Sequence, residues 1–153
     1  MSKNTTKPND LDVTNLATCT CANLRQAARV VTQAYNDALR PVGLRATQFT
    51  VLAKLSAKNK TPLTQLAEAL VMDRTTLTRN LKPLERRKLI RIGHEDDLRV
   101  RSVSITEAGS KVFEEALPEW QRVQMQIYSK LGKERWAGFI GDLGEAVSAV
   151  QNS

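Results

Sequence analysis

The spacing of apolar side chains changes along the chain, and this change restricts the fold more than any other feature. Several segments repeat apolar residues every three or four positions, which predicts helices, while two short runs alternate apolar and polar residues, which predicts strands. The expected helices cover residues 11–42, 46–57, 65–70, 73–88, 107–131 and 133–150, and the expected strands cover 90–92 and 101–105. We therefore expect a mainly α fold of the α+β class, with one β-hairpin inside a series of helices.

Short polar residues, glycine and proline predict where these helices begin, end or bend. Thr64, Asp73 and Thr106 precede helical runs and are expected to act as N-caps. Gly132 is expected to end the helix 107–131. Two prolines lie inside helical segments; we expect a bend at Pro83, and either a bend or a break at Pro118.

Residues 64–88 have the spacing of a helix-turn-helix. Ala67 supplies the small side chain that two closely crossing helices require, and Leu77 and Leu81 supply the apolar face below it. Glycine is usual in the turn because the backbone there needs a positive φ. Val71 occupies that place, so we expect a turn of different construction. With the hairpin that follows, the motif predicts a winged helix-turn-helix domain whose wing covers 90–105.

The order of elements predicts four parts. Residues 1–10 are expected to form a flexible polar arm, 11–42 an N-terminal dimerisation helix, 43–106 a winged helix-turn-helix DNA-binding domain, and 107–153 C-terminal dimerisation helices. The terminal helices carry longer apolar stripes than so small a middle domain can cover. We therefore expect a homodimer in which these helices pair.

Charge and composition exclude several classes of protein. The formal net charge is +7 and the isoelectric point is about 9.7, which favours a polyanionic partner. No apolar run is long enough to span a membrane, and no signal peptide is recognisable, so we expect a cytoplasmic protein. The single histidine, His94, lies in the expected wing, and no glycine-rich phosphate loop is present. We expect neither an enzyme nor a cofactor.

The second helix of the motif presents a polar face with no acidic residue between Arg74 and Leu84. Arginine can bind guanine through two hydrogen bonds, and threonine can contact phosphate, base edges or the thymine methyl group. We expect this face to enter a major groove of double-stranded DNA; the alternative is a solvated polar face. The expected base-reading residues are Thr75, Thr76 and Arg79, the expected phosphate contacts are Arg74, Lys82 and Arg86, and Thr78 lies on the same face.

The wing supplies a second expected DNA contact. Arg99 and Arg101 follow the loop tip, from which a flexible cation can enter the adjacent minor groove. Asp97 lies two residues before Arg99 and is expected to orient its guanidinium. The alternative is a loop whose charges serve solubility.

Six segments in this order resemble the MarR family of winged-helix regulators. They are GLRATQF (43–49), LTQLA (63–67), DRTTLTR (73–79), LERRKLI (84–90), DLR (97–99) and VSITEAG (103–109). The chain departs from the family pattern at Val71 and Lys88, which stand where glycine is usual. The resemblance implies a homodimer whose recognition helices enter successive major grooves of a pseudo-palindromic operator, with half-sites about 10 bp apart. It also implies repression that a small anionic or phenolic compound, or an oxidant, relieves.

Cys19 and Cys21 leave two interpretations open. One is that both are small packed apolar residues. The other follows from a branch of the family that senses organic hydroperoxides, in which a reactive cysteine precedes a tyrosine with the spacing of Cys21 and Tyr35. Ala46 stands where that branch has a second tyrosine. Without a reactive cysteine, the expected effector is a small ligand near Trp120 or the aromatic residues of the first helix.

Two other functions remain compatible with a winged helix. A protein-interaction module would not need an acid-free recognition helix. A non-specific architectural DNA binder would show steep salt dependence without a preferred sequence. A metal site is not expected, since the two cysteines lack a second ligand pair.

Overall fold

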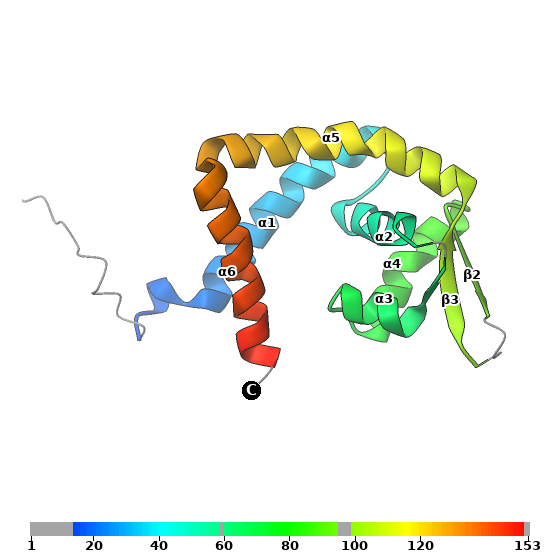
Figure 1. The fold of residues 1–153 in the computed structure, drawn as a ribbon, viewed down its shortest axis with the longest axis horizontal. Helices are drawn as coiled ribbons and strands as arrows, with labels where there is room; N and C mark the ends of the chain where they lie inside the picture. The colour runs from blue at the N-terminus through cyan, green and yellow to red at the C-terminus, as the bar shows by residue number, and fades with distance from the viewer. Residues whose placement is uncertain (1–13, 59, 95–98, 152–153) are drawn as a thin grey trace, which may run out of the picture. The chain divides into compact units, whose positions relative to one another are not determined.

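The computed structural model describes residues 14–58, 60–94 and 99–151. The chain divides into two compact units, Met1–Ala34 and Tyr35–Ser153. The elements are α1 (Thr20–Leu39), α2 (Ala46–Ser56), β1 (Thr61–Pro62), α3 (Leu63–Ala69), α4 (Arg74–Arg86), β2 (Ile90–His94), β3 (Arg101–Ile105), α5 (Glu107–Leu131) and α6 (Lys133–Gln151) (Figure 1). Within the described ranges, no helix is both long and apolar enough to cross a membrane.

The first unit contains a 3₁₀ turn, Leu16–Thr18, and most of α1. The Asn15 side chain caps this turn by accepting a hydrogen bond from the Ala17 amide at 2.9 Å. The prediction that one helix extends from residue 11 is therefore wrong for the described residues, because α1 begins only at Thr20; residues 11–13 and the predicted arm lie outside them. After α1, a second 3₁₀ turn covers Arg40–Val42.

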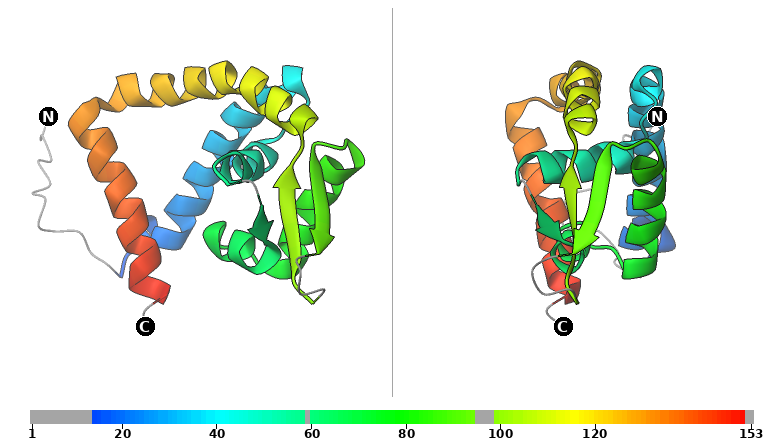
Figure 2. Two further views of the ribbon diagram at one scale, coloured as in Figure 1. Left: turned by 45° about the vertical axis from the view of Figure 1, so that its right-hand side comes forward. Right: turned by 90° about the vertical axis from the view of Figure 1, so that its right-hand side faces the viewer.

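The second unit contains a three-stranded antiparallel sheet in the order β1-β3-β2. Ile90 lies opposite Ile105 and Ile92 opposite Val103, which confirms the predicted hairpin. Figure 2 shows β2 and β3 side by side. The sequence did not predict β1, because two residues are too few to show an alternating pattern.

The core of this unit lies where α2, α3, α4 and α5 meet the sheet. Its fully buried residues come from each of these elements and from the end of α1: Leu39, Val51, Leu52, Leu55, Leu66, Leu77, Leu81, Leu84, Val103 and Ala116. Ala67 is also buried, as the helix-turn-helix spacing predicted. Burial of these side chains holds one face of α4 against the domain and leaves its opposite face in solvent.

The end of α4, the start of β2 and the start of α5 meet at one joint. The Thr106 amide donates to the Leu89 carbonyl at 3.0 Å, and the Thr106 hydroxyl donates to the Lys88 carbonyl at 2.7 Å. A Cβ on Gly109 would lie 2.0 Å from the Leu89 carbonyl oxygen, so only glycine fits the first turn of α5 here. The joint therefore connects the end of α4 directly to the long helix α5.

The predicted helix ends are partly right. Asp73 and Thr106 cap α4 and α5 through their side chains, and Gly132 follows the last residue of α5, as expected. Thr64 does not cap α3, because the helix begins earlier at Leu63, after Pro62. Pro118 does not divide α5, which is continuous from Glu107 to Leu131.

Val71 and Lys88 have positive φ angles of 51° and 58°, so the predicted change of turn construction is wrong. After α3, the Val71 amide donates to the Glu68 carbonyl and the Met72 amide to the Ala67 carbonyl. After α4, the Lys88 and Leu89 amides donate in the same way to Glu85 and Leu84. Both pairs form the Schellman motif, in which glycine is usual at the left-handed position. The hydrogen bonds and the core impose this backbone on side chains that disfavour it.

Candidate nucleic-acid interface

The solvent face of α4 gathers positive charge. Leu77, Leu81 and Leu84 bury the opposite face, while all four cations of the helix are exposed: Arg74, Arg79, Lys82 and Arg86. The only carboxylate of the helix, Glu85, lies in its last turn. The face is therefore positively charged over its first three turns.

This face contains an open hollow of about 540 Å³. Its lining residues are Arg74, Thr75, Thr78, Arg79 and Lys82. The three cations among them are Arg74, Arg79 and Lys82. None of the three forms a salt bridge with a carboxylate in the described part of the chain. The structure thus brings together five of the six α4 residues expected near DNA between Arg74 and Lys82, while Arg86 lies exposed beyond the hollow.

Asp73 fixes the start of this face. Its carboxylate accepts hydrogen bonds from the Thr76 amide at 2.8 Å and from the Thr76 hydroxyl at 2.7 Å. The Thr76 amide, and next the Thr76 hydroxyl, lower the pKa of this carboxyl. The cap therefore stays ionised at neutral pH and favours the positive end of the helix dipole.

The three threonines of α4 differ in what their hydroxyls contact. The Thr76 hydroxyl donates to Asp73, and its side chain is half-buried, a capping role that sequence reasoning missed. The Thr78 hydroxyl donates to the Arg74 carbonyl at 2.8 Å, which leaves its methyl group and lone pairs available. Thr75 is exposed in the hollow. Base reading by Thr75 and Thr76 stays a prediction.

In the wing, Arg101 is the first residue of β3 and lies opposite His94, the last residue of β2. Arg99 and Arg101 are both exposed, while Asp97 lies outside the described residues, so its expected role in orienting Arg99 stays a prediction. Lys60 Nζ donates to the His94 carbonyl at 3.3 Å, a contact that the sequence did not suggest. This bond attaches the segment before β1 to the end of the wing strand.

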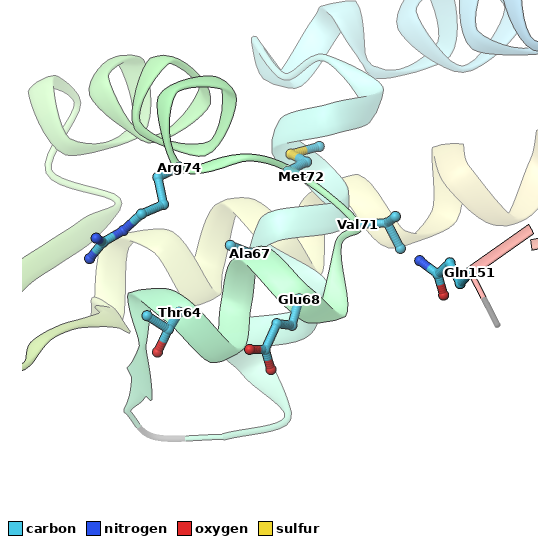
Figure 3. A pocket seen from close by; sticks show the side chains of 7 residues that line it. All are labelled: Thr64, Ala67, Glu68, Val71, Met72, Arg74 and Gln151. Carbon is cyan, nitrogen blue, oxygen red and sulfur yellow. The ribbon is translucent and has the colours of Figure 1, made fainter. Parts of the chain in front are cut away.

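A second hollow, of about 670 Å³, lies beside the turn between α3 and α4 (Figure 3). Its lining residues are Thr64, Ala67, Glu68, Val71, Met72, Arg74 and Gln151. Arg74 lines both hollows, and its side chain points away from Val71 (Figure 3). Because Glu68 and the apolar Val71 line this side, the positive surface ends at Arg74.

A smaller aromatic cavity, of about 230 Å³, lies away from this face. Its lining residues are Tyr35, Leu39, Ala46, Phe49, Thr50 and Trp120. The Trp120 ring stacks on Phe49 with centroids 5.7 Å apart and planes inclined by 19°. Trp120 is therefore both part of the core packing and part of a cavity wall.

The Tyr35 hydroxyl donates to Gln124 Oε1 at 2.5 Å, a partner that sequence reasoning missed. Burial raises the pKa of Tyr35, so the phenol keeps its proton at neutral pH. That single proton is committed to Gln124 in this structure. Cys19 and Cys21 are free thiols in the first unit, with Cys19 before α1 and Cys21 exposed on its first turn. No cluster of three or more potential metal ligands occurs among the described residues.

Comparison with known proteins matches the chain to one family of regulators and to individual transcriptional regulators. The family model described as MarR family matches residues 44–100. The chain is 38% identical to the transcriptional regulator MosR of M. tuberculosis, whose crystal structure contains DNA; the match covers 86% of this chain and 98% of that one, with a TM-score of 0.76. It is 29% identical over 117 residues to YhbI of Bacillus subtilis, an uncharacterised HTH-type transcriptional regulator, covering 72% and 76% of the two chains.

A third match shows the fold alone. A cysteine-to-serine mutant of MarR from E. coli, crystallised with operator DNA, is 20% identical and has a TM-score of 0.78. The match covers 88% of this chain and 98% of that one. The predicted winged-helix fold is therefore confirmed.

Proposed function

The chain belongs to the MarR family of transcriptional regulators, and on this premise we propose that it binds a specific operator in double-stranded DNA as a homodimer and represses transcription there. The prediction that it is not an enzyme is confirmed by the same relatives. The observation that carries the proposal is the acid-free, cationic hollow along α4. We also propose the cytoplasm as its location, where its operator would be.

Within this proposal, Thr75, Thr76 and Arg79 contact base edges in the major groove. Arg74, Lys82 and Arg86 bind phosphates, and Thr78 packs its methyl group in the groove. Arg99 or Arg101 enters the minor groove from the wing. These assignments agree with the exposure of all the cations named, and with the shared hollow that contains Arg74, Arg79 and Lys82.

The homodimer rests on apolar side chains that remain in solvent on the terminal helices. They are Val30 and Val31 on α1, Met125 on α5, and Phe139, Ile140, Val147 and Val150 on α6. No residue of α6 within its described length is fully buried. Pairing of two chains through α1, α5 and α6 would remove these side chains from water.

The test is fluorescence anisotropy with DNA from upstream of the protein's own gene, in excess unrelated DNA. Arg79→Ala is expected to cost about 1–3 kcal/mol of operator binding and to relax specificity at one base position. Lys82→Ala is expected to weaken all sequences alike and to lower the salt slope by about 0.9. Lys111→Ala is the control. It removes a cation of α5 to which no DNA contact is assigned, and it should change neither the operator affinity nor the salt slope.

Three contrary outcomes have different consequences. Equal affinity of the unmodified protein for operator and unrelated DNA would favour a non-specific architectural binder. No DNA binding at all would favour a protein-interaction module. If Arg79→Ala kept full operator preference, its assigned base contact would be wrong.

We further propose that the aromatic cavity at Trp120 takes the effector. Its small volume and stacked walls suit a single aromatic ring, and the Tyr35–Gln124 pair adjoins it with polar atoms. Compounds with one ring and a carboxylate or phenol should release the operator and change Trp120 emission in a Trp136→Phe background. Ala46→Leu, which fills the cavity, should keep operator binding but abolish release.

The alternative effector is an oxidant acting at Cys21. An organic hydroperoxide would then release the operator, a thiol would restore binding, and Cys21→Ser would abolish the response while Cys19→Ser kept it. Release by hydroperoxide in Cys21→Ser would contradict this alternative.

A further inference from the structure

Two adjacent arginines at the end of α4 differ in the contacts they make. Both side chains are exposed, and Arg86 lies in the last turn of the helix. Arg87 reaches back to a segment 44 residues earlier, where its Nη1 donates to the Gly43 carbonyl at 2.5 Å. Its Nη2 donates to the Val42 carbonyl at 3.4 Å. The guanidinium therefore connects the recognition helix to the segment between α1 and α2.

The segment that accepts these bonds is itself well held. Gly43 has a φ of 69° and follows the 3₁₀ turn Arg40–Val42. The Leu44 amide donates to the Leu39 carbonyl at 3.2 Å, and the Ala46 amide donates to the Asn36 side chain at 2.8 Å. A guanidinium is a strong donor, and carbonyls at the end of a helical turn attract a cation.

The glycine at this place leaves room for the arginine. A Cβ on Gly43 would lie 3.3 Å from Nη2 of Arg87, which is tighter than nine in ten Cβ contacts, so the guanidinium would have to shift. The φ of 69° at Gly43 is also a left-handed conformation that favours glycine over a residue with a Cβ. Both ends of the contact are therefore fitted to each other.

We propose that Arg87 is a positioning residue for operator binding, which fixes the direction of α4 relative to the 40–43 segment without contacting DNA. The buried leucines of α4 hold the helix by apolar burial, which has no directional preference, whereas the Arg87 hydrogen bonds are directional. Arg79 lies eight residues before Arg87, about 12 Å along the helix at 1.5 Å per residue. A small rotation at Arg87 thus moves the expected base-reading residues by a distance that matters for base contacts.

This inference rests on the proposed operator binding, and the test separates the two. Arg87→Met, Arg87→Lys and the adjacent Arg86→Met are each titrated with operator and with unrelated DNA over a range of salt concentrations. Methionine keeps most of the aliphatic length and removes the donors. Arg86→Met is the matched control, since it removes an arginine expected to bind phosphate one residue away.

Arg87→Met, which removes both hydrogen bonds, is expected to weaken operator binding about tenfold, because α4 is then no longer held in one direction before it binds; unrelated-DNA affinity and the salt slope should not change. Arg87→Lys, which can still donate to one carbonyl, should recover part of this loss. Arg86→Met should instead weaken both DNAs together and lower the salt slope by about 0.9.

Two results would overturn the positioning role. One is parallel loss on both DNAs with a lower salt slope, which would make Arg87 a phosphate contact. The other is an unchanged operator affinity in Arg87→Met. Urea unfolding shows whether each variant is folded, and Val123→Ala in α5 serves as a control of lowered stability with the arginine intact. If the unmodified protein shows no operator preference, the proposed function itself fails.

Discussion

Replacing Lys88 by glycine should make the protein more stable. Lys88 has a φ of 58° in the Schellman motif that ends α4, and its side chain is exposed. In this backbone region a residue with a Cβ is less stable by about 1–2 kcal/mol, and glycine avoids this destabilisation. Glycine in turn costs about 0.4–1 kcal/mol through the greater freedom of the unfolded chain. The expected net gain is about 1 kcal/mol.

Lys88→Ala is the control that isolates the backbone effect. Alanine and glycine both remove the ammonium group, which lies near the C-terminal end of α4, and both remove the aliphatic chain. Only glycine also removes the Cβ. The quantity to compare is therefore the stability of Lys88→Gly relative to Lys88→Ala, not relative to the unmodified protein alone.

Urea unfolding measures this difference at one fixed protein concentration, because the midpoint of the proposed homodimer would depend on concentration. A gain of about 1 kcal/mol corresponds to about 2–4 °C in Tm for a chain of this size. The slope of the transition should not change. If Lys88→Gly unfolds at the same or a lower urea concentration than Lys88→Ala, the strain assigned to the positive φ is absent.

Three further substitutions test separate contacts. Val71→Gly should be more stable than Val71→Ala in the same urea assay by a similar amount, because both variants lose the one-third-buried valine side chain and only glycine also loses the Cβ at a φ of 51°. Asp73→Ala should be less stable than the unmodified protein at neutral pH; since the pKa of Asp73 is lowered on folding, this difference should vanish as the pH falls through that lowered pKa. Asp73→Asn, which caps without titrating, should not show this loss, and a pH-independent defect in Asp73→Ala would contradict the assignment. Tyr35→Phe should cost about 1 kcal/mol, and a double-mutant cycle with Gln124→Leu should show that the two losses are not additive.

The elements that the sequence predicted are those with a strong local signal. The period of three or four located α4 and α5, and alternation located β2 and β3. Asp73 and Thr106 were identified as caps because the short polar side chain and the following helical run are adjacent in sequence. Such features depend on neighbours within one turn, so they can be found without knowledge of the tertiary structure.

Features that depend on distant partners were missed or mistaken. The strand β1 exists because Thr61 and Pro62 pair with Val103 and Ser102, a pairing with no local pattern. Val71 was expected to alter the turn, yet the hydrogen bonds that end α3 override its backbone preference. Local propensity is a weak guide where tertiary contacts fix the backbone.

In the candidate interface too, the sequence predicted the features with a local signal and missed the contacts between distant residues. The cations of α4 could be placed on one face from their spacing alone. The contacts of Arg87 with Gly43, of Tyr35 with Gln124 and of Lys60 with His94 join residues at least 34 positions apart. No spacing rule connects such pairs, so only the structure shows them.

The joint at residues 88–89 and 105–109 has a consequence for how the wing can vary. Strand β2 leaves this joint and β3 returns to it, since Ile90 pairs with Ile105 beside the Thr106–Leu89 hydrogen bond. Residues inserted or removed at the far end of the hairpin therefore change how far the wing extends without shifting α4 or α5. In the proposed homodimer, wing length would be free to adapt to different DNA, while the spacing of the two α4 helices would be set by parts of the chain that the wing does not disturb.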